Sequence, residues 1–182
     1  MHGQWEKSLS ADERDAISWY TSYGYGDIND YWRKKDGWEY INSEIVEEAS
    51  KQLDSAISRY ELKDNIIVQR GVEDIFSESF SGGDINSERD FIGRIFTDKG
   101  YGSSTALYGN RTATAKPVVY EIEVPAGVGR GAYINQFGGQ YQDIEYEFLL
   151  AKDGRYVVTD VIINDEPIPQ QTIIKMRLIV DE

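Results

Sequence analysis

The change in hydrophobic period near residue 60 constrains the fold of this chain more than any other sequence feature. Between Ser43 and Tyr60 the apolar residues recur at helical spacing and predict one long helix with a buried stripe. That stripe consists of Ile45, Ala49, Leu53, Ala56, Ile57 and Tyr60. The next segment, Asn65–Gly71, is rich in β-branched residues, which favour a strand ending at a glycine. Helices are therefore expected early in the chain and strands late.

Shorter elements follow the same division. Ser10 and Glu13 have the spacing of a capping box and predict a helix that ends near Gly24. The other expected elements are a short helix capped by Asp27, a loop at Glu73–Asp84, a short helix at Ser87–Ile95 and strands at Gly102–Leu107, Pro117–Val124, Gly131–Asn135, Ile144–Ala151, Tyr156–Ile163 and Thr172–Val180.

This order of elements predicts an α+β fold, because helices and strands are segregated and do not alternate as βαβ units. Val157–Ile163 and Ile173–Val180 are apolar on both faces for part of their length, which favours packing between two sheets. We therefore expect N-terminal helices packed on a two-sheet β-sandwich of mixed, largely antiparallel strands. The 182 residues suit a single domain, 1–182, and the opening Met1-His2-Gly3 is compatible with a domain excised from a larger protein.

The composition of the chain argues against several kinds of catalytic and metal site. The chain has no cysteine, which excludes disulfides, thiolate zinc sites and cysteine nucleophiles. Its single histidine, His2, lies in what the sequence predicts to be an unstructured terminus, which argues against a Ser-His-Asp triad or a histidine metal site. Any chemistry must come from carboxylates, arginines, hydroxyls and aromatic rings, and no metal is expected.

The net charge of −13 argues against nucleic acid and anionic membranes as partners, since both are bound by basic surfaces. An acidic protein can still bind an anionic small molecule when a few arginines point into one cleft. We expect a monomer. No signal peptide and no membrane-spanning apolar run is present in the sequence.

Glu145 and Glu147 are the most unusual pair of residues in the chain. In a strand, residues two apart project to the same face, so both carboxylates would lie together. Neighbouring anions repel each other, and a strand gains nothing in stability from them. The alternative is a solvated strand face with two ordinary glutamates, which this stretch alone favours.

Two upstream segments supply further polar groups. Arg70 ends an apolar strand, and Gly71 after it allows close approach of backbone or ligand, so the guanidinium could bind phosphate oxygens. In the segment Ser103-Ser104-Thr105, the first and third hydroxyls share a strand face and could orient a carboxylate or bind a ribose. Each segment alone also reads as an ordinary strand end or polar edge strand.

The loop after the hydroxyl segment contains an aromatic ring and a cation. Tyr108 could stack on a planar ring, and Arg111 could bind a second phosphate. Two other segments do not match the ligand-binding motifs that they resemble. Gly127–Gly131 has its third glycine one residue too early for a dinucleotide fingerprint, and Asp27–Asp30 lacks the alternate ligand and the glycine of a calcium loop.

In this order, Arg70, then Ser103-Ser104-Thr105, then Glu145-x-Glu147, the chain resembles the bacterial mono-ADP-ribosyltransferase toxins. The resemblance is to the branch that contains the enzymatic components of clostridial binary toxins and the Rho-modifying exoenzymes. It spans nearly the whole chain and also includes Tyr20-Thr21, Ile28-Asn29, and Tyr108 with Arg111. One departure is that Ser104 and Thr105 stand where the family has threonine and then serine.

The resemblance implies the ADP-ribosyltransferase fold and a reaction that breaks the nicotinamide–ribose bond of NAD and attaches ADP-ribose to a protein side chain. It implies that Glu147 stabilises the oxocarbenium-like transition state and that Ser103 orients Glu147. The other implied roles are activation of the attacking group for Glu145, diphosphate binding for Arg70 and Arg111, stacking near nicotinamide for Tyr108, and lining of the NAD cleft for Gly71, Tyr20, Asn29, Ser104 and Thr105.

The same resemblance bears on the acceptor. Glu-x-Glu occurs in relatives that modify arginine, and actin is a common target among them, so Glu145 favours arginine in a host or competitor protein. Phe137 and Tyr141, in the loop before Glu145, are expected to recognise that protein. A secreted protein, or one delivered into a target cell, is implied.

Three other functions remain open from the sequence. The chain could be an NAD glycohydrolase without transfer, or a non-enzymatic interaction domain of a phage or effector protein. A glycoside hydrolase is disfavoured, because its two carboxylates must flank the scissile bond and neighbours on one strand face rarely do.

Overall fold

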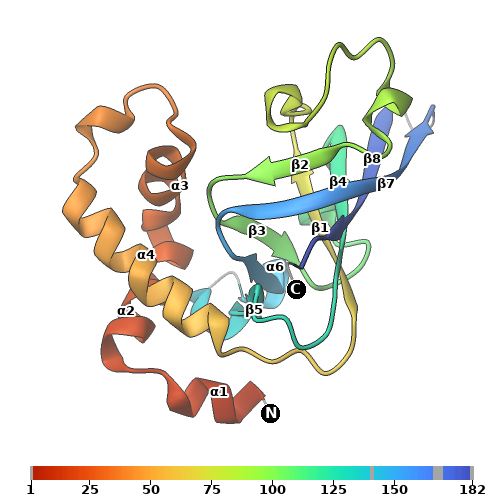
Figure 1. Ribbon diagram of the computed structural model, residues 1–182. Helices are drawn as coiled ribbons and strands as arrows, with labels where there is room; N and C mark the ends of the chain where they lie inside the picture. Colours follow the sequence, from red (N-terminus) through yellow and green to blue (C-terminus); the bar gives the residue numbers. More distant parts are fainter. Residues whose placement is uncertain (1, 140–141, 166–169, 181–182) are drawn as a thin grey trace.

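The computed structural model describes residues 2–139, 142–165 and 170–180, and its N-terminal third is helical (Figure 1). Helices α1 (His2–Ser8), α2 (Ala11–Trp19), α3 (Tyr25–Arg33) and α4 (Ser43–Ser58) group beside the strands. A π-helical turn, Tyr20–Gly24, joins α2 to α3. The short helices are the 3-10 turns Trp38–Tyr40, Ser77–Ser79, Glu88–Phe91 and Asn135–Phe137, and α5 (Arg111–Thr114) and α6 (Gln142–Glu145).

The predicted capping box is present at the start of α2. The Ser10 hydroxyl accepts a hydrogen bond from the Glu13 amide at 3.1 Å, and the Glu13 carboxylate accepts one from the Ser10 amide at 2.9 Å. Glu13 is buried and also pairs with Arg59 at 2.7 Å, which ties α2 to the end of α4. The N-terminal segment, expected to be unstructured, forms helix α1, whose Trp5 indole donates to the Ala56 carbonyl at 2.8 Å.

Helix α4 has the predicted position, but its buried stripe is offset from the prediction. Leu53, Ala56 and Ile57 are buried as expected, together with Val46. Ile45 is 55% exposed, so its assignment to the buried stripe was wrong. The sequence pattern admits both residues because Ile45 and Val46 are adjacent apolar positions, and packing chooses Val46.

The strands begin after residue 65 and confirm the α+β prediction. They are β1 (Ile66–Val72), β2 (Ile95–Asp98), β3 (Gly102–Thr105), β4 (Val118–Val124), β5 (Gly131–Tyr133), β6 (Glu147–Leu150), β7 (Gly154–Asn164) and β8 (Gln171–Leu178). Their order is β2-β7-β8-β4-β1-β3-β6-β5, and every pair is antiparallel except the parallel β4–β8 pair.

All eight strands are hydrogen-bonded in one series, yet they form two halves. Strands β1 and β3 pair only at Gln69 and Thr105, so the β2-β7-β8-β4-β1 half is joined to the β3-β6-β5 half at one point. Phe148 and Leu150 of β6 share a core with Val68 of β1 and other residues of the larger half. This is the expected packing between two layers, made by one bent series of strands.

The opposite face of the smaller half is covered by the helices. Leu149 of β6 and Ala132 of β5 belong to a second core with Ile17 of α2 and Leu53 of α4. The side chains of β6 therefore alternate between the strand core and the helical core, and all four residues of this strand are buried. This double burial fixes the strand that begins at Glu147.

Two local predictions were wrong. The expected strand Ile144–Ala151 begins only at Glu147, because residues 142–145 form α6 and Tyr146 turns the chain with φ +49°. Strand β2 was expected as part of a short helix and the turn after it. Its pairing with β7, from Ile95 opposite Val157 onward, is a long-range contact that the local pattern does not reveal.

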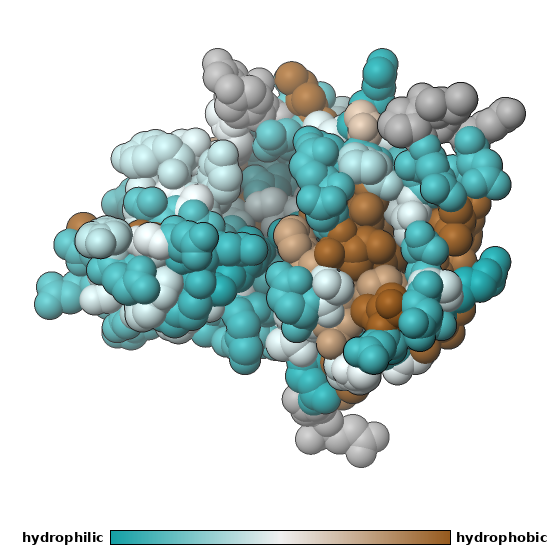
Figure 2. Space-filling model, turned by 90° about the horizontal axis from the view of Figure 1, so that it is seen from above, coloured by the Kyte–Doolittle hydropathy of each residue, from teal (hydrophilic) through white to brown (hydrophobic). Residues whose placement is uncertain are grey.

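The surface differs between the helical and strand parts. Figure 2 shows a mostly hydrophilic surface over the helical part and hydrophobic residues gathered over the strand part. Among the described residues, no helix has both the length and the apolarity needed to cross a membrane.

Candidate active site

A cleft of about 500 Å³ lies where the two strand halves meet the helices. Its walls come from the π-helical turn, from β1, from β3, from α5 and from the segment that carries the two glutamates. The lining residues are Tyr20, Thr21, Ser22, Tyr25, Gln69, Arg70, Gly71, Ser103, Ser104, Thr105, Thr112, Ala113, Glu145 and Glu147. Eight residues assigned from the sequence to catalysis or cofactor binding are among them.

Strand register explains how Ser103 and Glu147 come together. In the antiparallel β3–β6 pair, Thr105 lies opposite Glu147 and Ser103 lies opposite Leu149. Residues two apart on a strand share a face, so Ser103, Thr105 and Glu147 all project to the cleft side. Ser103 is therefore the diagonal neighbour of Glu147, and a side-chain hydrogen bond joins them.

The other two hydroxyls of this segment bond to the protein. The Ser104 hydroxyl donates to the Phe148 carbonyl at 2.7 Å, which fastens β3 to β6. The Thr105 hydroxyl oxygen accepts from the Leu107 amide at 3.2 Å and from the Asn110 side chain at 3.3 Å. Both residues are buried, so the exchange of serine and threonine relative to the family pattern falls at positions that support the strand and the following loop.

Glu147 is 7% exposed and has an unusual acidity. Burial raises the pKa of its carboxyl to about 7, the hydrogen bond from Ser103 opposes that rise, and the negative charge of Glu145 adds to it. The backbone amide of Glu147 donates to the Asn135 side chain at 3.0 Å, which fixes the start of the strand. A carboxyl that titrates near neutral pH in a cleft is typical of a functional site.

Glu145 reaches the same cleft from a different element. It ends helix α6 and does not share a strand face with Glu147, contrary to the prediction from alternation. Tyr146 between them adopts a left-handed conformation, and its carbonyl accepts from the Ala106 amide at 2.9 Å. This turn brings both carboxylates to the cleft, and partial burial raises the pKa of Glu145.

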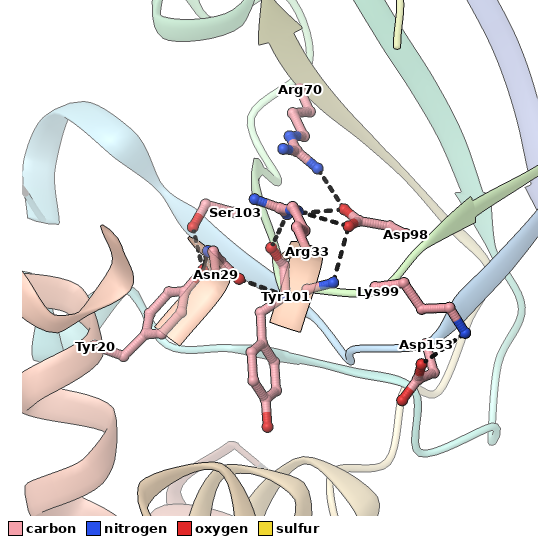
Figure 3. A network of polar contacts seen from close by, with 10 residues as sticks. Tyr20, Asn29, Arg33, Arg70, Asp98, Lys99, Tyr101, Ser103 and Asp153 are labelled. Atoms are coloured by element: carbon pink, nitrogen blue, oxygen red, sulfur yellow. Dashed lines mark hydrogen bonds and ion pairs between the residues drawn. The ribbon is translucent and has the colours of Figure 1, made fainter. Parts of the chain in front are cut away.

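A chain of hydrogen bonds from Asn29 through Tyr20 orients the Ser103 hydroxyl. The Asn29 side-chain oxygen accepts from the Tyr101 amide at 2.7 Å, which leaves its NH₂ group to donate to the Tyr20 hydroxyl at 3.0 Å. Ser103 gives its one hydroxyl proton to the Glu147 carboxylate, so in the 3.0 Å contact between the two hydroxyls Tyr20 is the donor and Ser103 the acceptor (Figure 3). Burial raises the pKa of Tyr20 to about 12, so this donor keeps its proton at neutral pH.

Arg70 is held by a residue that the sequence did not single out. The Asp98 carboxylate accepts from the Arg70 guanidinium at 2.8 Å and from Arg33 at 2.8 and 2.9 Å (Figure 3). Burial raises the pKa of Asp98, but the two guanidinium groups outweigh burial and hold that pKa below its ordinary value. Two cations and one anion leave this cluster with a net positive charge at the cleft, in a protein whose net charge is −13.

Two glycines permit the close packing around this cluster. A Cβ on Gly71 would lie 2.4 Å from the Ala113 carbonyl oxygen, so the glycine admits helix α5 against β1. A Cβ on Gly100 would lie 2.7 Å from the Asn29 side-chain oxygen and 2.8 Å from Arg33. Gly71 therefore allows close approach of backbone, one of the two possibilities that the sequence left open.

Several predicted site residues lie outside the cleft lining. Tyr108 is 64% exposed and does not line the cleft; its hydroxyl donates at 3.1 Å to the Glu121 carboxylate, which also accepts at 3.2 Å from Gln69 in the cleft wall. Arg111 is exposed at the start of α5, and Asn29 acts through Tyr20. Phe137 is partly buried against the helical core, with its carbonyl accepting from Thr21 at 3.0 Å.

Tyr141 lies outside the described residues.

Sequence reasoning missed Asp98, Arg33, Gln69 and Tyr25. Asp98 and Arg33 are separated by 65 residues, and only the folded chain brings them together. Gln69 could have been found from its place beside Arg70 in the same strand. Tyr25 lies one residue after the π-helical turn, a rare helix type that often marks functional sites.

The cleft contains no arrangement suited to a metal. Among the described residues no group of three histidine, cysteine, aspartate or glutamate side chains is placed to hold an ion. Its polar groups are hydroxyls, two carboxylates and a guanidinium, which together suit a ligand that carries both sugar hydroxyls and phosphate.

Residues 1–181 match the sequence family described as ADP-ribosyltransferase exoenzyme. The chain belongs to this family. Membership confirms the predicted resemblance and identifies the protein as a mono-ADP-ribosyltransferase of the exoenzyme toxin type. A search of curated proteins found no match.

Solved structures of such toxins share the fold. Plx2a, an ADP-ribosyltransferase toxin from Paenibacillus larvae, superposes with a TM-score of 0.80 at 24% identity over 98% of this chain and 90% of its own. The Clostridium limosum C3 exoenzyme gives 0.76 at 22% identity, covering 97% and 90%. C3stau2 from S. aureus, solved with NAD, gives 0.73 at 24% identity, covering 99% and 95%.

Proposed function

We propose that this protein cleaves NAD at the nicotinamide–ribose bond and transfers ADP-ribose to an arginine side chain of another protein. The single observation that carries this proposal is the convergence of Glu147, Ser103, Arg70 and Glu145 on one cleft of about 500 Å³. Such a cleft has the size of an ordinary small-molecule site. One similar toxin, C3stau2, was solved with NAD, which supports NAD as the co-substrate.

Arg70 is suited to the diphosphate of NAD. Within the described part of the chain its guanidinium donates one hydrogen bond, to Asp98, which leaves its other N–H groups for phosphate oxygens. Asp98 also restrains the side chain, so less conformational entropy is lost when the diphosphate binds. Arg33 contributes charge to the same cluster without lining the cleft.

Glu147 is suited to the reacting ribose. As the bond from ribose C1′ to nicotinamide breaks, nicotinamide leaves with the electron pair and positive charge develops on the ribose. A carboxylate held beside the sugar stabilises that charge, most strongly where water is excluded. Burial raises the pKa of Glu147 to about 7. The positively charged nicotinamide ring of NAD bound beside it would lower that pKa and favour the carboxylate form that the reaction needs.

Glu145 is suited to the acceptor. The nitrogen of the incoming guanidinium forms a bond to ribose C1′ and loses one proton, for which Glu145 is the available base. Partial burial raises the pKa of Glu145 and makes it a better proton acceptor than an exposed glutamate. It ends α6, whereas Glu147 begins β6, so the two carboxylates reach the cleft from different elements.

The proposal extends to the acceptor protein. Actin, with one of its arginines as the acceptor, is the first protein to test, and the setting is a secreted toxin or one delivered into a target cell. NAD hydrolysis without transfer is the second candidate, because it needs Glu147 but not Glu145.

The test is incubation of the protein with labelled NAD and either purified actin or a host-cell lysate, followed by mass spectrometry of the labelled peptides. The proposal predicts ADP-ribose on arginine. Modification of asparagine would contradict the acceptor assignment, and nicotinamide release without any labelled protein would establish the glycohydrolase instead.

A further inference from the structure

A second hollow, separate from the active-site cleft, lies between α2 and α4 and has a volume of about 570 Å³. Its apolar lining consists of Ala16 and Trp19 of α2 and Ile45 and Ala49 of α4. We call this hollow the α2–α4 groove. None of its residues belongs to the lining of the active-site cleft.

The groove carries an apolar residue that folding does not explain. Ile45 is 55% exposed, whereas Val46 beside it is 1% exposed and belongs to the helical core. Ile45 and Ala49 are four residues apart, so they lie one above the other on a second face of α4. Ala16 is buried, and Trp19 and Ala49 are partly buried against the helical core, so Ile45 beside Trp19 is the apolar contact that the groove offers to a partner.

Four carboxylates border this apolar stripe. They are Asp12 and Asp15 of α2 and Glu44 and Glu48 of α4, and no cationic side chain lines the groove. Asp12 and Glu44 lie in the first turns of their helices, where they offset the helix dipole. Asp15 and Glu48 lie beyond the first turns, so the dipole does not account for them.

These carboxylates are weakly compensated. In the described part of the chain Asp12, Asp15 and Glu44 form no ion pair. Glu48 pairs with Lys51 at 3.9 Å on the exposed helix surface and accepts a hydrogen bond from the Gln52 side chain at 2.7 Å. Four negative charges around one groove repel each other, and a cationic partner would relieve that repulsion. The groove therefore suits a partner that makes apolar contact at the centre and places positive charge at the edges.

Trp19 connects the groove with the active-site cleft. Its ring packs against Gly24, where a Cβ would lie 2.5 Å from the indole. Gly24 ends the π-helical turn that places Tyr20 and Thr21 in the cleft wall. A partner seated in the groove would therefore contact Trp19, the residue that packs against this turn.

We propose that the α2–α4 groove binds a cationic amphipathic helix of a partner protein, with the apolar face of that helix on Ile45 and Trp19. Helix-in-groove recognition uses apolar anchors at helical spacing, and charges at the rim set the orientation and the association rate. A second copy of this chain is a poor occupant, because two chains of charge −13 repel each other. The proposal stands independently of the transferase assignment.

The absence of cysteine permits a direct test with the whole protein. Ile45→Cys provides one site for an environment-sensitive fluorophore in the groove, and Ile67→Cys, on β1, provides a control site. The probe is a synthetic helical peptide with leucines on one face and lysines on the other. We expect a saturable blue shift from the Ile45→Cys label and none from the Ile67→Cys label.

A second experiment tests whether the carboxylates at the edge of the groove contribute to binding. It compares two matched double variants without a fluorophore, and the label is on the peptide. Asp15→Asn/Glu48→Gln removes two rim charges beyond the first helical turns, and Asp36→Asn/Glu39→Gln removes the same charge from exposed positions outside the groove. Loss of two exposed ion pairs is expected to weaken peptide binding about fivefold in the first variant, and the second variant should bind within about twofold of the parent.

Any of three results with the peptide would overturn the proposal. These are equal weakening in both double variants, equal binding of the peptide with glutamate in place of lysine, or no response of the Ile45→Cys label. A concentration-dependent dimer in light scattering that Ile45→Ser abolishes would assign the groove to a second copy of the chain and also refute the proposal. Because none of these measurements uses NAD, their failure is distinguishable from failure of the transferase function.

Discussion

Replacing Glu147 by glutamine should stabilise the folded protein while removing its activity. The carboxyl is 7% exposed and has its pKa raised from 4.5 to about 7, mainly because burial disfavours the charged form. Between these two pH values the folded protein holds a proton that the unfolded chain has lost. Its free energy of unfolding therefore falls as pH rises through this window and is level above about pH 7.

The size of the effect follows from the same two pKa values. A rise from 4.5 to about 7 corresponds to about 3 kcal/mol of destabilisation by the charged form at pH 8. Glutamine has the same shape, stays neutral at every pH and can still accept the Ser103 hydrogen bond. The stability difference between Glu147→Gln and the parent should thus grow by about 3 kcal/mol between pH 4.5 and pH 8.

Urea unfolding of both proteins, followed by tryptophan fluorescence at several pH values, measures this difference. Glu39→Gln, at an exposed position, is the control and should show no such trend. A stability difference between Glu147→Gln and the parent that is constant across this pH range would refute the claim that charging the buried Glu147 carboxyl destabilises the folded protein.

Three further variants separate the roles of the other groups. Asp98→Asn leaves Arg70 without its buried counter-ion and should lower the free energy of unfolding by about 3 kcal/mol in urea titrations, with a raised KM for NAD. Tyr20→Phe removes the donor to Ser103 and should lower kcat about tenfold, the worth of one good hydrogen bond, with KM little changed in steady-state assays. Glu145→Gln should reduce transfer to arginine about a hundredfold while nicotinamide release continues, and equal loss of both activities would contradict the division between the two glutamates.

The overall architecture was predictable because local periodicity reports burial directly. The helical spacing before residue 60 and the β-branched run after it give the correct class, and the capping box at Ser10 and Glu13 marks a helix start by a local hydrogen-bond pattern. The exact face of α4 was not predictable, since Ile45 and Val46 both satisfy the apolar pattern. Only packing against α2 and α3 distinguishes them.

The site was predictable where its residues follow one another in a motif. The motif alone predicts that Ser103 and Glu147 act together, and the register of β3 and β6 makes them diagonal neighbours. Asp98 was missed because its function depends on two arginines that are distant in the sequence. The strand expected through Glu145 was wrong because alternation cannot anticipate the left-handed turn at Tyr146.

Single-turnover release of nicotinamide from NAD by the parent and by Glu147→Gln tests the central claim most directly. The account predicts a rate about a thousandfold lower in Glu147→Gln, the usual cost of removing a group that stabilises transition-state charge, with NAD binding retained through Arg70. A rate within about tenfold of the parent, in a variant that still binds NAD, would contradict the assignment of Glu147 as the residue that stabilises the reacting ribose.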